Sequence, residues 1–158
     1  MAETKAAEIN FGELAISDIG TKLYSAPIAE DGTVPATGFK QLVPIKATPA
    51  TGGEPANLDA TEMDMSVKGA IPDRQEVPTQ TFTFNATETK YQAVKKVDNG
   101  KRHAFLVVYA DGQGALSVGK ATVFKNALSV GAVLEGTLSI TAESMKDLKA
   151  TETATMIA

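Results

Sequence analysis

The sequence predicts a mainly β fold, either a β-sandwich or a small β-barrel, with one flanking α-helix. Along most of the chain, apolar residues recur at every second position, which is the period of a strand with one buried face. Only one segment spaces its apolar residues as a helix does, and turns containing Gly, Asp or Asn separate the runs. With 158 residues, of which 43% are apolar, the chain is expected to form one domain with its own core.

Two strands are expected near the start of the chain. The first spans residues 20–28 and is closed by the turn at Asp31-Gly32. The second alternates apolar and basic residues over 39–47. Pro44 lies within it and cannot donate a ladder hydrogen bond, so this strand is expected to be bulged or to lie at a sheet edge.

Residues 48–57 are expected to form a loop, because this stretch holds two prolines and two glycines. A strand with strict alternation is predicted over 61–68. Its faces would carry different residues: Met63, Met65 and Val67 on one, and Glu62, Asp64, Ser66 and Lys68 on the other. The strand after it, 78–85, would turn Phe82 and Phe84 toward the core.

One helix is predicted after these strands. Thr87 is suited to its N-cap and Glu88 to the positive end of its dipole, and Asn99-Gly100 would end it. The apolar residues fall three positions apart on one face, and two lysines on the other face would be solvated: Tyr91, Val94 and Val97, against Lys95 and Lys96.

The rest of the chain predicts a three-stranded meander. Residues 104–109 are continuously apolar, which indicates a central strand buried on both faces. A hairpin turn at 111–114 leads to a strand over 115–124. A further turn at 126–131 leads to the last strand, 133–141, in which Leu134, Leu138 and Ile140 would face inward.

The two ends are expected to lie outside the core. The start is polar without the apolar stretch of a signal peptide, and the chain after Lys149 is small and polar and is expected to be loose. No run approaches the roughly 20 apolar residues of a membrane helix, so a soluble chain made in the cytoplasm is expected. The expected organisation is one domain over 1–158, with its core at 19–142, and with 1–18 and 143–158 flexible or interface-forming.

The residues that catalysis and metal binding need are scarce. The chain has no cysteine and one histidine, His103, which shares a predicted strand face with Phe105, Val107 and Tyr109 and is expected to be structural. This composition excludes the common zinc sites and a Cys–His pair. There is no Gly-x-Ser-x-Gly elbow, phosphate-binding loop or dinucleotide fingerprint. We therefore expect no enzymatic activity, no cofactor and no metal.

The acidic residues near the middle of the chain do not predict a site either. Asp64-x-Ser66-x-Lys68 begins like a calcium loop, but Lys68 would repel the ion and Gln75 stands where such a loop ends in Glu. Glu62 and Asp64 could pair as glycosidase carboxylates, yet the predicted strand face has no aromatic platform for a sugar. A solvated face is expected.

Charge is distributed unevenly. Residues 1–79 hold 12 acidic and 6 basic residues, whereas residues 80–158 hold 7 and 9. The simpler interpretation is a loop-rich first half, since all 7 prolines lie there. The sharper one is a dipolar subunit whose acidic and basic parts meet head to tail. An acidic chain without a basic stripe cannot neutralise many phosphates, which argues against nucleic-acid binding.

Several short segments occur in a characteristic order. They are 19–24 with Ala26-Pro27, 61–66 with a turn at Gly69, 71–74, 82–85, the short helix with Tyr91, 104–109, Asp111-Gly112 and 130–141. This series covers roughly residues 19–142 and resembles the tail tube (major tail) proteins of long-tailed bacteriophages.

The resemblance implies a β-sandwich with a flanking helix that assembles into hexameric rings, which stack into a tube. DNA would pass through the tube into the host cell without specific binding. The partners implied are further copies of the chain and other tail proteins, and the location implied is the virion tail, after synthesis in the host cytoplasm. The tube proteins of contractile tails and of type VI secretion look like relatives in fold. An acidic wall fits a conduit, because many weak phosphate contacts would otherwise hold the DNA.

Under this interpretation two sets of residues are candidate sites. The first is an intersubunit arm: Pro49, Gly52, Gly53, Pro55, Met63 and Met65. The second is a set of charges in the lumen or at an interface: Glu62, Asp64 and Lys68. Met63 and Met65 could equally be ordinary core residues, since methionine adapts to either environment.

Two other classes stay open. One is a β-sandwich binding module for a carbohydrate or protein ligand, against which the absence of Trp and the 6% aromatic content count. The other is an enzyme of unrecognised type. Electron microscopy of the purified protein would separate these classes from a self-assembling subunit.

Overall fold

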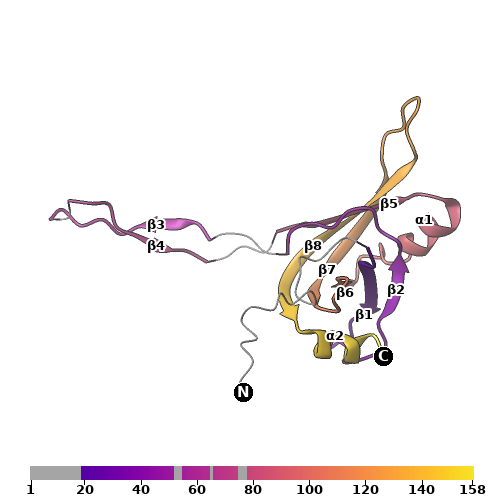
Figure 1. Ribbon diagram of the computed structural model, residues 1–158, viewed down its shortest axis with the longest axis horizontal. Helices are drawn as coiled ribbons and strands as arrows, with labels where there is room; N and C mark the ends of the chain where they lie inside the picture. Colours follow the sequence, from indigo (N-terminus) through magenta and orange to yellow (C-terminus); the bar gives the residue numbers. More distant parts are fainter. Residues whose placement is uncertain (1–18, 52–54, 65, 75–77) are drawn as a thin grey trace, which may run out of the picture.

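A computed structural model of the chain describes residues 19–51, 55–64, 66–74 and 78–158. The main sheet has six antiparallel strands in the order β2-β1-β6-β7-β8-β5 (Figure 1). These strands are β1 Lys22–Pro27, β2 Lys40–Val43, β5 Gln80–Asn85, β6 Arg102–Val108, β7 Gly114–Lys125 and β8 Glu135–Leu148. The helices are α1 Glu88–Lys95 and α2 Ala150–Met156. A second sheet pairs β3 Asn57–Asp59 with β4 Ala70–Pro72. The prediction of a mainly β fold is confirmed.

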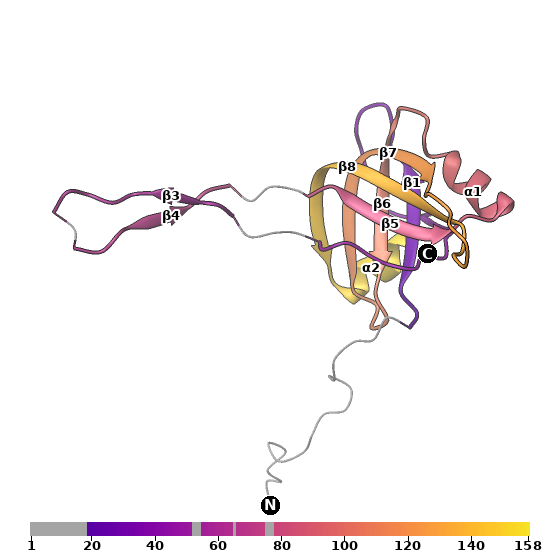
Figure 2. The ribbon, with the colours of Figure 1, turned by 90° about the horizontal axis from the view of Figure 1, so that it is seen from above.

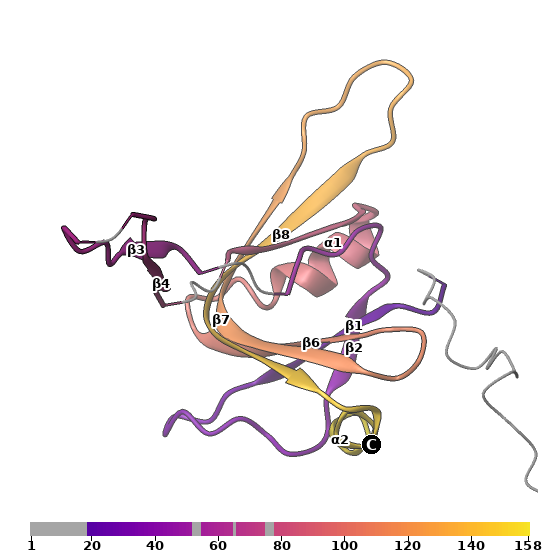
Figure 3. The same cartoon turned by 60° about the vertical axis from the view of Figure 1, so that its left-hand side comes forward.

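The main sheet is rolled, and its two edges meet at one point (Figures 1 and 3). Beyond β2, the backbone N–H of Lys46 donates to the carbonyl of Thr83 in β5 at 2.7 Å, and Ala47 forms a single bridge with Thr83. No further ladder joins these edges among the described residues, so the roll is not a closed barrel. As predicted, β2 is an edge strand, and it ends before Pro44.

Two glycines allow the long strands to bend and pack. The β7–β8 register shifts between Val118 and Gly119, and a Cβ at Gly119 would lie 2.1 Å from the carbonyl oxygen of Thr141. At Gly136, a Cβ would lie 2.5 Å from the Phe84 ring. Only glycine permits these close approaches. A side chain at Gly119 would push β7 away from the backbone of Thr141, and one at Gly136 would displace the Phe84 ring.

The core lies on both sides of β6. Phe105 and Val107 face the interior of the roll, where they join the buried phenylalanines of β5 and the buried face of α1. Ala104 and Leu106 face the opposite side, where Leu148 and the end of α2 cover them. The predicted burial of this strand on both faces is therefore confirmed, and each large apolar side chain buried here contributes about 1.5–3 kcal/mol.

The predicted helix forms with its expected face inward. Val94 and Val97 are buried, and Tyr91 packs partly against the same cluster. Thr87 is the N-cap residue with extended backbone, although its side chain makes no capping hydrogen bond. The chain turns at Gly100, whose φ of 75° favours glycine.

The strand predicted over 61–68 is wrong. These residues connect β3 to β4, and the described ones among them form turns and bends at the tip of a hairpin. The sequence does alternate here, but a strand also needs a neighbouring strand to take its backbone hydrogen bonds. Among the described residues, the hairpin pairs three positions, from Asn57↔Pro72 to Asp59↔Ala70, and none of them lies in 61–68.

The end of the chain was expected to be loose, but residues 143–158 are mostly part of β8 and α2. β8 continues to Leu148, because the first half of β7 needs a partner, and α2 then packs beside β6. Thr153 of α2 is buried, and its hydroxyl donates to the carbonyl of Lys149 at 3.0 Å. The backbone N–H of Phe39 donates to the carbonyl of Met156 at 3.1 Å, which fastens the helix to the segment before β2.

Candidate assembly surfaces

The β3–β4 hairpin, described over 55–64 and 66–74 and here called the arm, lies away from the rolled sheet (Figures 1 and 2). Its ladder is extended at both ends by backbone bonds. Ala60 donates to Gly69 at 3.0 Å, and Asp73 donates to Ala56 at 2.6 Å. Every described residue of the arm is exposed except Ala60 and Gly69, which are half-buried.

A side-chain turn ends the ladder and starts the tip of the arm. The Asp59 carboxylate accepts a hydrogen bond from the backbone N–H of Thr61 at 2.9 Å, and the Thr61 hydroxyl oxygen accepts one from the N–H of Gly69 at 3.0 Å. Hydrogen bonds from Thr61, the side-chain one first, lower the pKa of Asp59. Such turns divert the backbone from a strand, which explains why the chain leaves the sheet after Asp59.

The arm exposes large apolar side chains. Leu58 and Ile71 are cross-strand partners and are 47% and 53% exposed. At the tip, Met63 is fully exposed and Val67 nearly so. A two-stranded hairpin standing alone is marginally stable in water, and exposed apolar side chains gathered on one element indicate a contact surface.

A second apolar projection is formed by the end of β7 and its connection to β8, residues 124–134, here called the β7–β8 tip. Its exposed large apolar residues are Phe124, Leu128, Val130 and Val133. The base of this hairpin is well held. The backbone N–H of Asn126 donates to the carbonyl of Glu135 at 2.8 Å, and the Thr137 hydroxyl donates to the Asn126 side chain at 2.6 Å.

The β7–β8 tip adjoins the basic side of α1. The ammonium group of Lys125 lies 4.7 Å from the centre of the Tyr91 ring, a cation–π contact that joins the two elements. Lys96 is exposed on the same helix and Lys90 is half-exposed. Glu135 at the foot of the tip is paired with Lys46 at 2.5 Å, so its charge is already matched.

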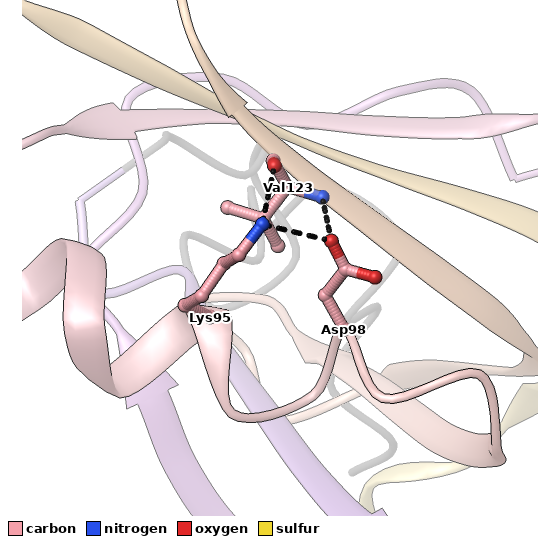
Figure 4. A network of polar contacts seen from close by, with 3 residues as sticks. All are labelled: Lys95, Asp98 and Val123. Carbon is pink, nitrogen blue, oxygen red and sulfur yellow. Dashed lines mark hydrogen bonds and ion pairs between the residues drawn. The ribbon is translucent and has the colours of Figure 1, made fainter.

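Lys95 and Asp98 form a polar network with the backbone of Val123, on the edge of β7 below the tip (Figure 4). β7 continues past Lys120, where its pairing with β6 ends. There the Asp98 carboxylate accepts from the N–H of Val123 at 3.2 Å, and Lys95 bonds Asp98 at 3.2 Å and the Val123 carbonyl at 3.5 Å. The hydrogen bond from Val123, followed by that from Lys95, lowers the pKa of Asp98. Lys95 was predicted to be solvated. Its side chain is partly exposed, but its ammonium group also binds Asp98 and Val123.

The candidate residues inferred from the sequence fall into two groups. Pro55, Met63, Glu62, Asp64 and Lys68 all lie exposed on the arm, but at its start and tip and not on one strand face. Pro49 is half-buried between β2 and the arm, while Gly52, Gly53 and Met65 lie outside the described residues.

The β7–β8 tip was missed by sequence reasoning. The sequence pattern predicts only a turn at residues 126–131, although Leu128 and Val130 are apolar residues inside it. These two residues could have indicated the exposed tip, because turns are normally polar and this turn has no core to fill.

The His103 ring occupies a structural position. The side chain is 9% exposed, its Nε2 lies 3.2 Å from the Asn99 side-chain oxygen, and its ring centre lies 6.2 Å from that of Phe105. Burial, followed by the charge of Lys101, lowers its pKa. The cleft beside it, about 540 Å³, has no Ser, Thr or Tyr among its described lining residues to serve as a nucleophile.

The described residues line a second cleft as well. A larger cleft of about 580 Å³ lies where residues 45–51 pass the β6–β7 turn, and its charged lining residues are Lys46 and Asp147. Among the described residues, no group of three or more His, Asp or Glu side chains lies close enough together to hold a metal. In the same ranges no helix is long and apolar enough to cross a membrane.

Comparison with known proteins gives a likeness in fold. No protein family model and no curated protein matches the chain. Among solved structures, the fold is similar to a chain in the cryo-EM structure of the anti-feeding prophage baseplate, which was determined with six-fold symmetry. The TM-score is 0.60 at 10% sequence identity, over 87% of this chain and 97% of that one. The mainly β fold with short helices therefore occurs in a prophage baseplate.

Proposed function

We propose that this chain is a structural subunit of a phage tail or tail-like particle, and that copies of it assemble into hexameric rings that stack into a tube. The observation that carries the proposal is the arm. It holds four exposed large apolar side chains on a hairpin of two short strands: Leu58, Met63, Val67 and Ile71. A neighbouring copy that covered them would stabilise the arm and the assembly together.

Two further observations support a ring of subunits. The similar chain belongs to a baseplate determined with six-fold symmetry, and it is matched over nearly its whole length. The order of short sequence segments over roughly residues 19–142 resembles tail tube proteins, and this likeness does not depend on the fold. Six copies with a net charge of −4 each would give an acidic wall, which would let DNA pass without adhering.

The alternative of a carbohydrate-binding module gains no support from the described surface. Such modules stack sugars on exposed aromatic side chains, and Phe124 is the only exposed aromatic residue among those described.

Sedimentation velocity and electron microscopy of the full chain over a range of concentrations test the proposal. Rings or tubes are expected, and a variant in which a short Gly-Ser linker replaces residues 55–74 is expected to stay monomeric. Circular dichroism and thermal unfolding of that variant should match those of the wild type, because the arm lies outside the rolled core. A wild type that is monomeric at every concentration would overturn the proposal.

A further inference from the structure

The arm and the β7–β8 tip are the two places where exposed large apolar side chains gather. Of the nine such residues in the described chain, four lie on the arm and four on or at the tip, and the remaining one is Ile19. Figure 1 shows the arm extending to the left of the rolled sheet and the tip rising above it, so the two projections of one chain point in different directions and their ends lie apart.

The charges around the two projections are complementary. The described part of the arm carries four acidic residues and two basic ones; the acidic ones are Asp59, Glu62, Asp64 and Asp73. Beside the tip, Lys125 stands on the Tyr91 ring of α1, and Lys90 and Lys96 lie on the same helix. Two of the nearby carboxylates are already matched, since Asp98 pairs with Lys95 and Glu135 with Lys46.

This pattern disfavours a symmetric dimer. Two arms brought together would place acidic tips against each other, and two tips brought together would oppose lysines. An arm against a tip instead covers apolar side chains on both partners and pairs charges of opposite sign at the rim. Contact between two different patches is heterologous, and it generates a closed ring or an open filament.

We infer that the β7–β8 tip and the adjoining face of α1 form a receiving surface for the arm of a second copy of this chain. The inference rests on the proposed self-assembly and adds the direction of the contact, which is head to tail. The apolar residues of the arm tip, Met63 and Val67, would pack against Leu128 and Val130. The acidic residues of the arm would then lie near Lys96 and Lys125.

Two disabled variants test the direction of the contact. The arm variant carries Met63→Asp with Val67→Asp, and the tip variant carries Leu128→Asp with Val130→Asp. All four positions are exposed and lie outside the strand ladders, so folding should persist, as circular dichroism can verify. Ile19→Asp is the control, because Ile19 is also exposed but lies on neither surface.

Each disabled variant should require a concentration higher by about tenfold or more to assemble, as expected when a charge replaces an apolar interface anchor. Their equimolar mixture should form a heterodimer, because one intact arm and one intact receiving surface remain between the two chains. Sedimentation velocity distinguishes this dimer from monomers and from larger assemblies.

Three results would overturn the inference. If wild type and control assemble but the mixture stays monomeric, the arm binds elsewhere, and the proposed function stands without this contact. If either variant dimerises by itself, the contact is symmetric. If the wild type fails to assemble at any concentration, the proposed function fails as well.

Discussion

The carboxylate of Asp98 accepts a hydrogen bond at 3.2 Å from the backbone N–H of Val123, on the edge of β7 that β6 no longer covers. Lys95 completes this network by donating hydrogen bonds to the Asp98 carboxylate and to the Val123 carbonyl. An uncovered strand edge can pair with any other strand it meets. These bonds therefore satisfy the backbone N–H and carbonyl of Val123 on this edge, near the foot of the β7–β8 tip.

Replacing Asp98 by alanine should destabilise the fold by about 1–3 kcal/mol, because the Val123 N–H is left without its acceptor in a buried position. Asp98→Asn is the matched control, since an amide oxygen can still accept from Val123 and only the charge is lost. Chemical denaturation measures both, and Asn should lie between alanine and wild type. Equal stability of all three proteins would show that water replaces the carboxylate at no cost.

The pH dependence of stability should reveal the same group. The folded pKa of Asp98 lies below its ordinary value, chiefly because of the hydrogen bond from Val123. Its stabilisation is therefore complete above the unfolded pKa of about 3.9, and is lost as the pH falls through that value and then through the folded pKa. The difference in unfolding free energy between wild type and Asp98→Ala should shrink below about pH 4. A difference that stays constant from pH 7 to pH 3 would contradict this assignment.

Gly119→Ala and Gly114→Ala should differ in severity. At Gly119 a new Cβ would meet the Thr141 backbone at 2.1 Å, whereas at Gly114 it would meet the Thr153 side chain at 2.7 Å. The first obstacle belongs to the β7–β8 ladder and cannot turn away, so a loss at or above the usual overpacking range of about 1–3 kcal/mol is expected. The second should mainly loosen α2. Hydrogen exchange would show global destabilisation for Gly119→Ala and local loss of protection in α2 for Gly114→Ala.

Reversing charge on the arm should weaken assembly and be rescued on the other surface. The double variant Glu62→Lys, Asp64→Lys would place positive charges against Lys96 and Lys125 of a neighbouring copy. Adding Lys96→Glu and Lys125→Glu to the same chain should restore pairs of opposite charge and, with them, assembly. Each exposed pair contributes at most about 1 kcal/mol, but identical contacts around a ring multiply the effect. Light scattering against salt concentration measures it. If the reversed arm leaves assembly intact and the tubes retain DNA, Glu62 and Asp64 line the lumen instead.

Local periodicity predicted most of the rolled sheet correctly. The residues around Phe82 and Phe84, residues 104–107 of the continuously apolar strand, and the helix face with Val94 are buried as expected, whereas residues 108 and 109 are half-buried. These predictions succeed because the alternation of side chains along a strand, or their spacing on a helix, is set by the backbone of that element alone. Of the prolines and glycines named for the candidate arm, Pro55 lies on the described hairpin and Pro49 lies before it.

The sequence by itself determined the strands of the rolled sheet that have a face to bury, the start of the helix α1 at Thr87 and Glu88, and the chemical groups that the chain lacks. It predicts the end of the helix at Asn99-Gly100, whereas α1 ends at Lys95. Only the tertiary structure decided three things: that the described residues of 61–68 form a hairpin tip and not a strand, that Asp98 and Lys95 reach Val123, and that α2 covers the outer face of β6. Each depends on a partner distant in the sequence. Hydrogen bonds and apolar burial depend on which surfaces meet, and a local pattern does not contain that information.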